Sequence, residues 1–146
     1  MGHGAFLSAF RSVFAETERD VPDVIERYRQ SATWTPFMLA EMPAGLLRKV
    51  ARQWAAACSY DATAISLHAE WYKFDLCLVS PAYDGAGDYW KSRTPLTIEH
   101  ENDSDVETEM WKLAHWRADL SVLVFHDFSA AECATDQQSG TSGCRA

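Results

Sequence analysis

The second half of the chain alternates strand, helix and strand, and this order restricts the fold more than any other feature. Residues 95–101 (PLTIEHE) begin apolar and end acidic, and they predict a buried strand; residues 119–125 (DLSVLVF) predict another. Between them, apolar side chains in residues 104–116 recur at helical spacing. A helix that joins two apolar strands favours a βαβ crossover, in which the strands are parallel neighbours.

Residues 64–80 (AISLHAEWYKFDLCLVS) are rich in aromatic and β-branched side chains and predict one or two further strands. Their continuous apolar run from Leu76 to Val79 is typical of a buried strand. Residues 81–93 contain a proline, an Asp-Gly and a Gly-Asp pair, which predict a loop. We therefore expect an α/β fold with a small mixed β-sheet, built from a meander plus the βαβ crossover and flanked by helices.

The first third of the chain predicts helices. Residues 5–30 place apolar side chains at helical spacing, with an interruption at Pro22, after which a second helix covers residues 22–30. Residues 44–58 predict a further helix with a charged outer side. The segment 31–43 contains two prolines and predicts a connection that carries an apolar patch.

Composition is that of one domain. The chain has 146 residues, and its hydrophobic fraction of 47% is sufficient for one core. We expect a single α/β domain over residues 1–128 and a polar, disordered tail over residues 129–146. No apolar run approaches the roughly 20 residues of a membrane-spanning helix. The N-terminus also lacks a basic segment followed by an apolar stretch. We therefore expect a cytoplasmic protein with no membrane partner.

The net charge of −8 argues against nucleic-acid binding, because contacts with phosphate require lysine and arginine. Bound cations would weaken this objection, since a metal ion reverses the sign of the local field. The four cysteines show no C-x-x-C spacing, so a zinc site is not predicted. The class of partner therefore depends on what the acidic side chains do.

Three carboxylates lie within the apolar strands. Asp75 directly precedes the buried run, and Glu99 and Glu101 point to one face of their strand because side chains alternate. A carboxylate in an apolar strand is costly unless it is paired, hydrogen-bonded or metal-bound. Together the three predict an oxygen-rich cluster suited to magnesium. Taken singly, each is better explained as an edge or solvent-facing residue, and Glu70 is better explained as an exposed strand residue than as a fourth member.

The order Asp75, loop, Glu99-His100-Glu101, helix and strand resembles the PD-(D/E)xK nuclease superfamily, which has the restriction endonuclease-like fold. The core of that superfamily is helix, three-stranded meander, helix and strand, with acidic residues on the second and third strands. The resemblance implies that Asp75 matches the aspartate of the second strand. It also implies that Glu99 and Glu101 match the paired positions of the third strand. His100, on the opposite face, is expected to be structural.

The chain departs from the common motif at two points. No proline directly precedes Asp75, and Glu101 stands where the commonest form has lysine. Some members carry an E-x-E form of the motif, and in others the lysine lies on the following helix, where this chain has Lys112. The resemblance implies a metal-dependent endonuclease that hydrolyses phosphodiester bonds of nucleic acid. DNA is the expected substrate and Mg²⁺, or Mn²⁺, the expected cofactor.

The resemblance also implies roles for the four site residues. Asp75 and Glu99 would bind the metal, and Glu101 would bind metal or act as the general base that activates water. Lys112 is the candidate for stabilising the charged transition state. An exposed helix lysine without a catalytic role is the more ordinary explanation for Lys112.

The alternative function is a non-catalytic protein-interaction module on the same fold, with a vestigial acidic site. The acidic net charge and the missing lysine at the third strand favour it. Such a module would act through an aromatic surface formed by Trp34, Phe37 and Trp90. A homodimer is compatible with both hypotheses.

Overall fold

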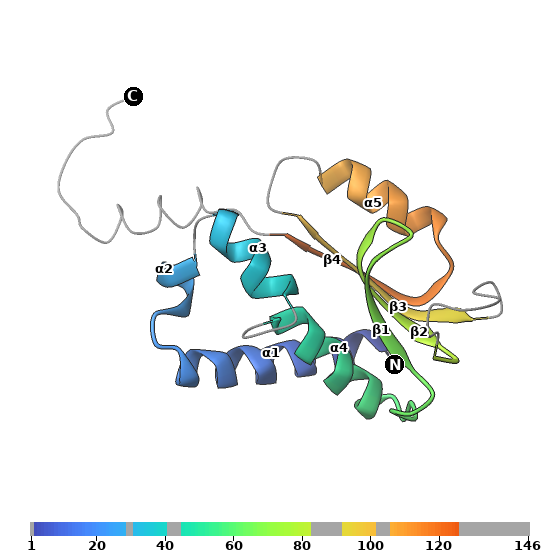
Figure 1. Cartoon of the computed structure of the whole chain (residues 1–146), viewed down its shortest axis with the longest axis horizontal. Coiled ribbons are helices and arrows are strands. Elements are labelled where there is room, and N and C mark those ends of the chain that lie inside the picture. The colour runs from blue at the N-terminus through green and yellow to red at the C-terminus, as the bar shows by residue number, and fades with distance from the viewer. Residues whose placement is uncertain (1, 29–30, 41–44, 83–91, 102–105, 126–146) are drawn as a thin grey trace.

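A computed structural model describes the chain (Figure 1). The described residues are 2–28, 31–40, 45–82, 92–101 and 106–125. The predicted polar tail and most of the predicted loop at 81–93, including Trp90, lie outside them. The extent of the domain and the disorder of the tail therefore stay predictions.

Four strands form one mixed sheet in the order β1-β2-β3-β4. The strands are β1 (Ser66–Trp71), β2 (Phe74–Ser80), β3 (Arg93–Glu101) and β4 (Ala118–Phe125). The first three pair antiparallel as a meander, and β3 and β4 pair parallel. The predicted α/β class, with a meander joined to a parallel pair, is therefore confirmed.

Helix α5 (Val106–His115) connects the parallel strands β3 and β4. Its position in the chain agrees with the crossover expected from the strand-helix-strand order. In Figure 1 this helix lies on one side of the sheet, and the N-terminal helices lie on the other. The sheet therefore has two differently covered faces.

The N-terminal helices are α1 (Gly2–Asp20), α2 (Val24–Tyr28), α3 (Ser31–Leu39) and α4 (Leu46–Ala57). Three of them were expected, but the connection expected at residues 31–43 is wrong, because α3 occupies most of it. Phe37 of α3 is buried and stacks on Tyr28, with 4.6 Å between the ring centroids. Packing of this kind outweighs the low helix propensity of proline and threonine in a short segment.

Helix α4 has the clearest amphipathic pattern. Its buried apolar residues recur at helical spacing and belong to the larger core, and they are Leu46, Leu47, Val50, Ala51, Trp54 and Ala55. The helix starts after Gly45, whose φ of 55° lies in the left-handed region. A Cβ atom at position 45 would stand 2.0 Å from the carbonyl oxygen of Ala40, so only glycine fits there.

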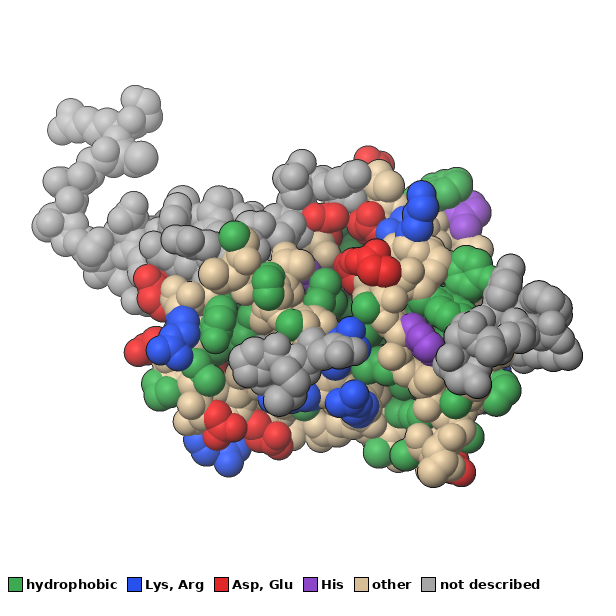
Figure 2. Space-filling model, viewed as in Figure 1, with side chains coloured by type: hydrophobic (Ala, Val, Ile, Leu, Met, Phe, Trp, Pro, Cys, Tyr) green, Lys and Arg blue, Asp and Glu red, His purple; other side chains and the backbone are tan. Residues whose placement is uncertain are grey.

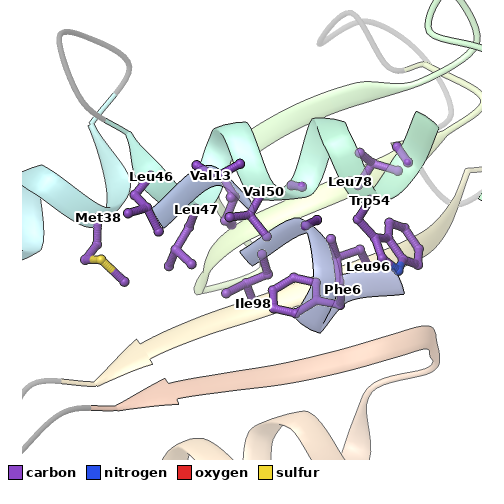
Figure 3. Close-up of a cluster of buried hydrophobic side chains, with 14 of the residues drawn as sticks. Phe6, Val13, Met38, Leu46, Leu47, Val50, Trp54, Leu78, Leu96 and Ile98 are labelled. Atoms are coloured by element: carbon purple, nitrogen blue, oxygen red, sulfur yellow. The ribbon is translucent and has the colours of Figure 1, made fainter. Parts of the chain in front are cut away.

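The larger core fills the space between the N-terminal helices and one face of the sheet (Figure 3). Phe6 and Val13 from α1 and Trp54 from α4 meet Leu78, Leu96 and Ile98 from the strands. The indole N–H of Trp54 donates to the carbonyl oxygen of Gly2 at 2.8 Å, which ties α4 to the start of α1. Each fully buried aliphatic side chain contributes about 1.5–3 kcal/mol to such a core.

The second face of the sheet has a smaller apolar cluster under α5. Its buried members are Phe74, Cys77, Val79 and Leu113. Because α5 is only ten residues long, it covers part of this face, and α5 is the one described helix that lies on it. No helix in the described part of the chain is long and apolar enough to cross a membrane.

Candidate functional site

The candidate site begins where the pairing of β2 with β3 ends. The last residues paired at this end of the two strands are Leu76 and Ile98. Continuing this antiparallel register by one step places Asp75 opposite Glu99. Leu76 and Ile98 face the larger core, so alternation turns Asp75 and Glu99 toward the face covered by α5. The sequence-based expectation that these two acids would be neighbours therefore agrees with the strand register.

Side-chain carboxylates continue the hydrogen bonding at this point. The backbone N–H of His100 donates to Oδ2 of Asp75 at 2.8 Å, and the backbone N–H of Asp75 donates to Oε2 of Glu99 at 3.3 Å. A buried N–H group needs an acceptor, and here each carboxylate supplies one across the strand boundary. Both side chains are thereby fixed in position, and Glu99 is only 2% exposed.

Lys112 brings a positive charge to this pair from α5. Its Nζ atom lies 2.6 Å from Oε1 of Glu99 and 2.6 Å from Oε2 of Glu109, and it donates to the carbonyl oxygen of Lys73 at 2.9 Å. An ammonium group has three N–H donors, and three oxygens from three different elements lie around this one. The ammonium also lies 5.8 Å from the ring centroid of Phe74. Lys112 is therefore a partly exposed residue that contacts the acidic pair, and not the exposed helix lysine of the more ordinary explanation. Its catalytic role stays a prediction.

Burial raises the pKa of the Glu99 carboxyl from 4.5 to about 7, and the bond to Lys112 opposes this rise while the charge of Asp75 adds to it. Burial also raises the pKa of Asp75, against the lowering effect of the His100 N–H. The hydrogen bonds to Glu109 and Glu99 raise the pKa of Lys112 despite its partial burial. The lysine therefore stays charged at neutral pH, whereas the two carboxyls hold their protons to a higher pH than free carboxyls do.

Further acidic side chains surround the pair. Glu70 on β1 is exposed, yet it is close enough for its charge to raise the pKa of Asp75. Figure 2 shows acidic side chains gathered beside α5, next to a basic one. Glu70 is thus an exposed strand residue, as expected. Its negative charge nevertheless acts on Asp75.

The cluster also affects Cys77, which lies on the same face of β2 and is fully buried. Burial raises the pKa of the Cys77 thiol to about 12, and the nearby Glu99 contributes to the rise. The thiol is therefore held in its neutral form beneath the carboxylate pair.

Glu101 and His100 occupy the end of β3. Glu101 is the last residue of the strand and is half-buried, on the same face as Glu99 by alternation. The hydrogen bonds and ion pairs that join Asp75, Glu99 and Lys112 do not include it. His100 is buried and, by the same alternation, faces the larger core, while its backbone N–H fixes Asp75. The burial of His100 and the bond from its backbone N–H agree with the structural part expected for it.

The turn between β1 and β2 brings a fourth element to the site. Trp71 pairs with Phe74, so Tyr72 and Lys73 alone form the turn. Both have left-handed backbones, with φ of 51° and 65°, which is the geometry of a type I′ hairpin turn. Non-glycine residues pay about 1–2 kcal/mol for this conformation. The contacts of Lys73 with Lys112 and of Tyr72 with Trp116 hold the turn in place.

Sequence reasoning did not assign site positions to Glu109 and Lys73. Glu109 could have been found from its spacing, because residues three apart on a helix are neighbours and Glu109 lies three residues before Lys112. No sequence signal marks the carbonyl oxygen of Lys73, because its position depends on a turn that lacks the usual glycine or asparagine.

The donor chemistry of the site fits a hard divalent cation only in part. Carboxylate oxygens of Asp75 and Glu99 are the ligands that Mg²⁺ prefers, and one or two carboxylates are sufficient when water and substrate phosphate complete the shell. Within the described residues, no group of three or more His, Cys, Asp and Glu side chains is arranged to hold a metal ion. Lys112 forms an ion pair with Oε1 of Glu99. A cation would therefore be held by the carboxylate of Asp75 and by Oε2 of Glu99.

The aromatic surface expected for the alternative function is wrong for two of its three residues. Trp34 and Phe37 are buried in the larger core at 8% and 3% exposure, and Trp90 lies outside the described residues. Both aromatic rings are needed to pack α3, which the sequence pattern did not predict.

Comparisons of the chain with protein-family models, with curated proteins and with solved structures find no match.

Proposed function

We propose that this protein is a metal-dependent nuclease-like domain that hydrolyses phosphodiester bonds of nucleic acid, with DNA as the expected substrate. One observation carries the proposal: Asp75, Glu99 and Lys112 converge from β2, β3 and α5 at the end of one strand pair. This order along the chain also fits the resemblance to the PD-(D/E)xK superfamily, in which some members carry an E-x-E form of the motif and others carry the lysine on the following helix. We assign the fold to the restriction endonuclease-like type on the same ground.

Each residue has a distinct part in this proposal. Asp75 and Glu99 would hold Mg²⁺ or Mn²⁺, and such an ion supplies charge compensation and acidifies a bound water. Lys112 is fixed by three oxygens, and its ammonium stabilises negative charge that develops on a phosphate next to Glu99. Glu101, half-buried at the strand end, is the candidate general base.

The raised pKa values of the Asp75 and Glu99 carboxyls support the assignment. Groups with pKa values shifted by burial and by like charges are concentrated at functional sites. A divalent cation at Asp75 and Glu99 would compensate the charge that a single lysine shares with Glu109. It would also offset the objection raised by the net charge of −8.

The alternative, a non-catalytic module with a vestigial site, is favoured by one observation. Lys112 already neutralises Glu99 at 2.6 Å, so the pair is stable without any metal. The two functions differ in a measurable property, since only the first requires that the site bind a divalent cation.

The test is cleavage of supercoiled plasmid DNA and of single-stranded RNA by the purified chain with Mg²⁺ or Mn²⁺. Asp75→Asn keeps an oxygen that accepts the His100 N–H but removes the charge, and Glu99→Gln does the same for the Asp75 N–H. Each should lower cleavage by at least about 100-fold. Glu107→Gln, an exposed residue on α5, is the matched control and should cleave like wild type. A wild-type protein that cleaves neither substrate and binds no Mn²⁺ in calorimetry would leave the alternative function.

A further inference from the structure

A pocket of about 620 Å³ opens between the β1–β2 turn and the start of β3 and β4. Its volume is in the range of small-molecule sites, about 300–1,000 Å³. Aromatic side chains from the turn and from the end of α5 form one part of its wall, and arginines form another. The lining residues used below are Trp71, Tyr72, Trp116, Arg93, Arg117 and Asp119.

The aromatic wall is well fixed. Trp116 donates its indole N–H to the hydroxyl of Thr94 at 3.0 Å, and its ring lies 5.3 Å from that of Phe74. The ring of Tyr72 lies 4.9 Å from that of Trp116, and yet Tyr72 is 45% exposed. The wall therefore has a rigid inner ring and an outer ring that is accessible from solvent, an arrangement on which a planar ligand can stack.

The basic part of the pocket wall is positively charged, although the chain as a whole is negatively charged. Arg93 and Arg117 line the pocket together with one acid, Asp119. Arg93 is held 3.8 Å from Asp119 and lies over the ring of Tyr60. Arg117 is exposed, and no carboxylate of the described residues lies within ion-pair distance of it. A local excess of positive charge on a chain of net charge −8 is complementary to an anionic ligand.

We infer that this pocket binds one unstacked nucleotide of a single-stranded nucleic acid, with the base against Tyr72 and Trp116 and a phosphate on Arg117. Aromatic rings hold bases of any sequence, and an arginine fits phosphate with paired donors. The inference deepens the proposed nuclease function and, as the assignment of a substrate subsite, rests on it. Tyr72 lines the pocket and Lys73, the next residue, contacts Lys112, so one turn links the pocket to the acidic site.

The test is fluorescence anisotropy of a labelled oligothymidylate of about ten nucleotides, a length that small single-strand-binding domains cover. EDTA is present, so that binding is measured without metal or cleavage. Tyr72→Ala and Arg117→Ala should each raise Kd at least about fivefold. Tyr72→Phe keeps the ring and should recover most of the affinity that Tyr72→Ala loses. Arg19→Ala removes an exposed arginine from α1, outside the pocket, and should bind like wild type. Circular dichroism melts confirm that each variant is folded.

Competition separates a nucleotide site from a general anion site. Thymidine monophosphate should displace the oligonucleotide at a concentration at which inorganic phosphate does not. Equal displacement by phosphate, unchanged affinity of Tyr72→Ala, or no binding by wild type overturns the inference. Binding in EDTA by a protein that does not cleave with Mg²⁺ rejects the nuclease function and keeps the nucleotide site. Cleavage with unchanged Kd in both variants rejects only the site.

Discussion

The Nζ atom of Lys112 lies 2.6 Å from Oε1 of Glu99, and the carboxylate it meets is almost completely buried. The lysine itself is partly exposed, so the pair joins a partly exposed cation to a buried anion. A buried carboxylate that loses its partner must either stay charged at a large cost or take up a proton. The stability of the site therefore depends on both residues together.

Lys112→Met should lower the free energy of unfolding by about 1–3 kcal/mol at neutral pH, because Glu99 loses its partner in a site that is only partly screened by solvent. The double variant with Glu99→Gln should recover part of this loss, because no unpaired carboxylate remains. Urea unfolding of the two single variants and the double variant gives the coupling energy. Lys49→Met, on the exposed side of α4, is the control. Additive effects in the double variant would contradict the pairing.

The pH dependence of stability should carry the signature of Glu99. Its pKa is raised from 4.5 to about 7 in the folded protein, so between these values the folded state holds a proton that the unfolded chain has lost. Unfolding then releases a proton, and the free energy of unfolding falls as pH rises through this window. Asp75, whose pKa is also raised, contributes in the same direction.

Urea unfolding at about pH 5 and about pH 8 measures this effect. The wild type should lose about 1–3 kcal/mol more than Glu99→Gln across the window, since the amide does not titrate. Glu107→Gln should keep the wild-type dependence. If wild type and Glu99→Gln have the same dependence, the raised pKa of Glu99 is disproved.

Gly45→Ala should destabilise the protein by about 2–4 kcal/mol, because the new Cβ would collide with the carbonyl oxygen of Ala40 and the left-handed backbone would be strained. Gly4→Ala is the matched control, since no atom lies within 4 Å of a Cβ at that helical position. It should be neutral or stabilising by up to about 1 kcal/mol. Thermal unfolding of the two variants makes the comparison, and equal losses at both positions would refute it.

Lys73→Gly should stabilise the hairpin by about 0.5–1 kcal/mol, because glycine adopts the φ of 65° without steric cost. The carbonyl oxygen that Lys112 contacts is retained in this variant. The same substitution at Lys49, the fourth residue of α4, should cost about 1 kcal/mol. A loss of stability at position 73 would show that its side chain has a role beyond the turn.

The sheet could be predicted because its signals are local and consistent. Each strand has a run of β-formers, and the helix between 95–101 and 119–125 leaves few alternatives to a parallel pair. That Asp75 and Glu99 lie next to each other follows from the alternation of side chains along a strand and from the antiparallel pairing of β2 with β3. These properties depend on the backbone pattern alone, which the sequence encodes directly.

Helix α3 and the contact of Lys112 with Glu99 could not be predicted in the same way. The α3 segment has weak helix formers and Pro36, and it is helical because Trp34 and Phe37 pack in the core. The reach of Lys112 depends on how α5 lies across the sheet, which no spacing in the sequence specifies. Both features are set by tertiary contacts between segments that are distant in the chain.

The fully buried thiol of Cys77 gives the protein an internal probe of β2. With a pKa of about 12 it has almost no thiolate at neutral pH, so a thiol reagent reacts with it only when β2 leaves the sheet. Cys58, at the end of α4, is partly exposed and should react earlier. The labelling rate at Cys77 therefore measures how often β2, the strand that carries Asp75, separates from the sheet. The measurement uses the native protein and needs no added fluorophore.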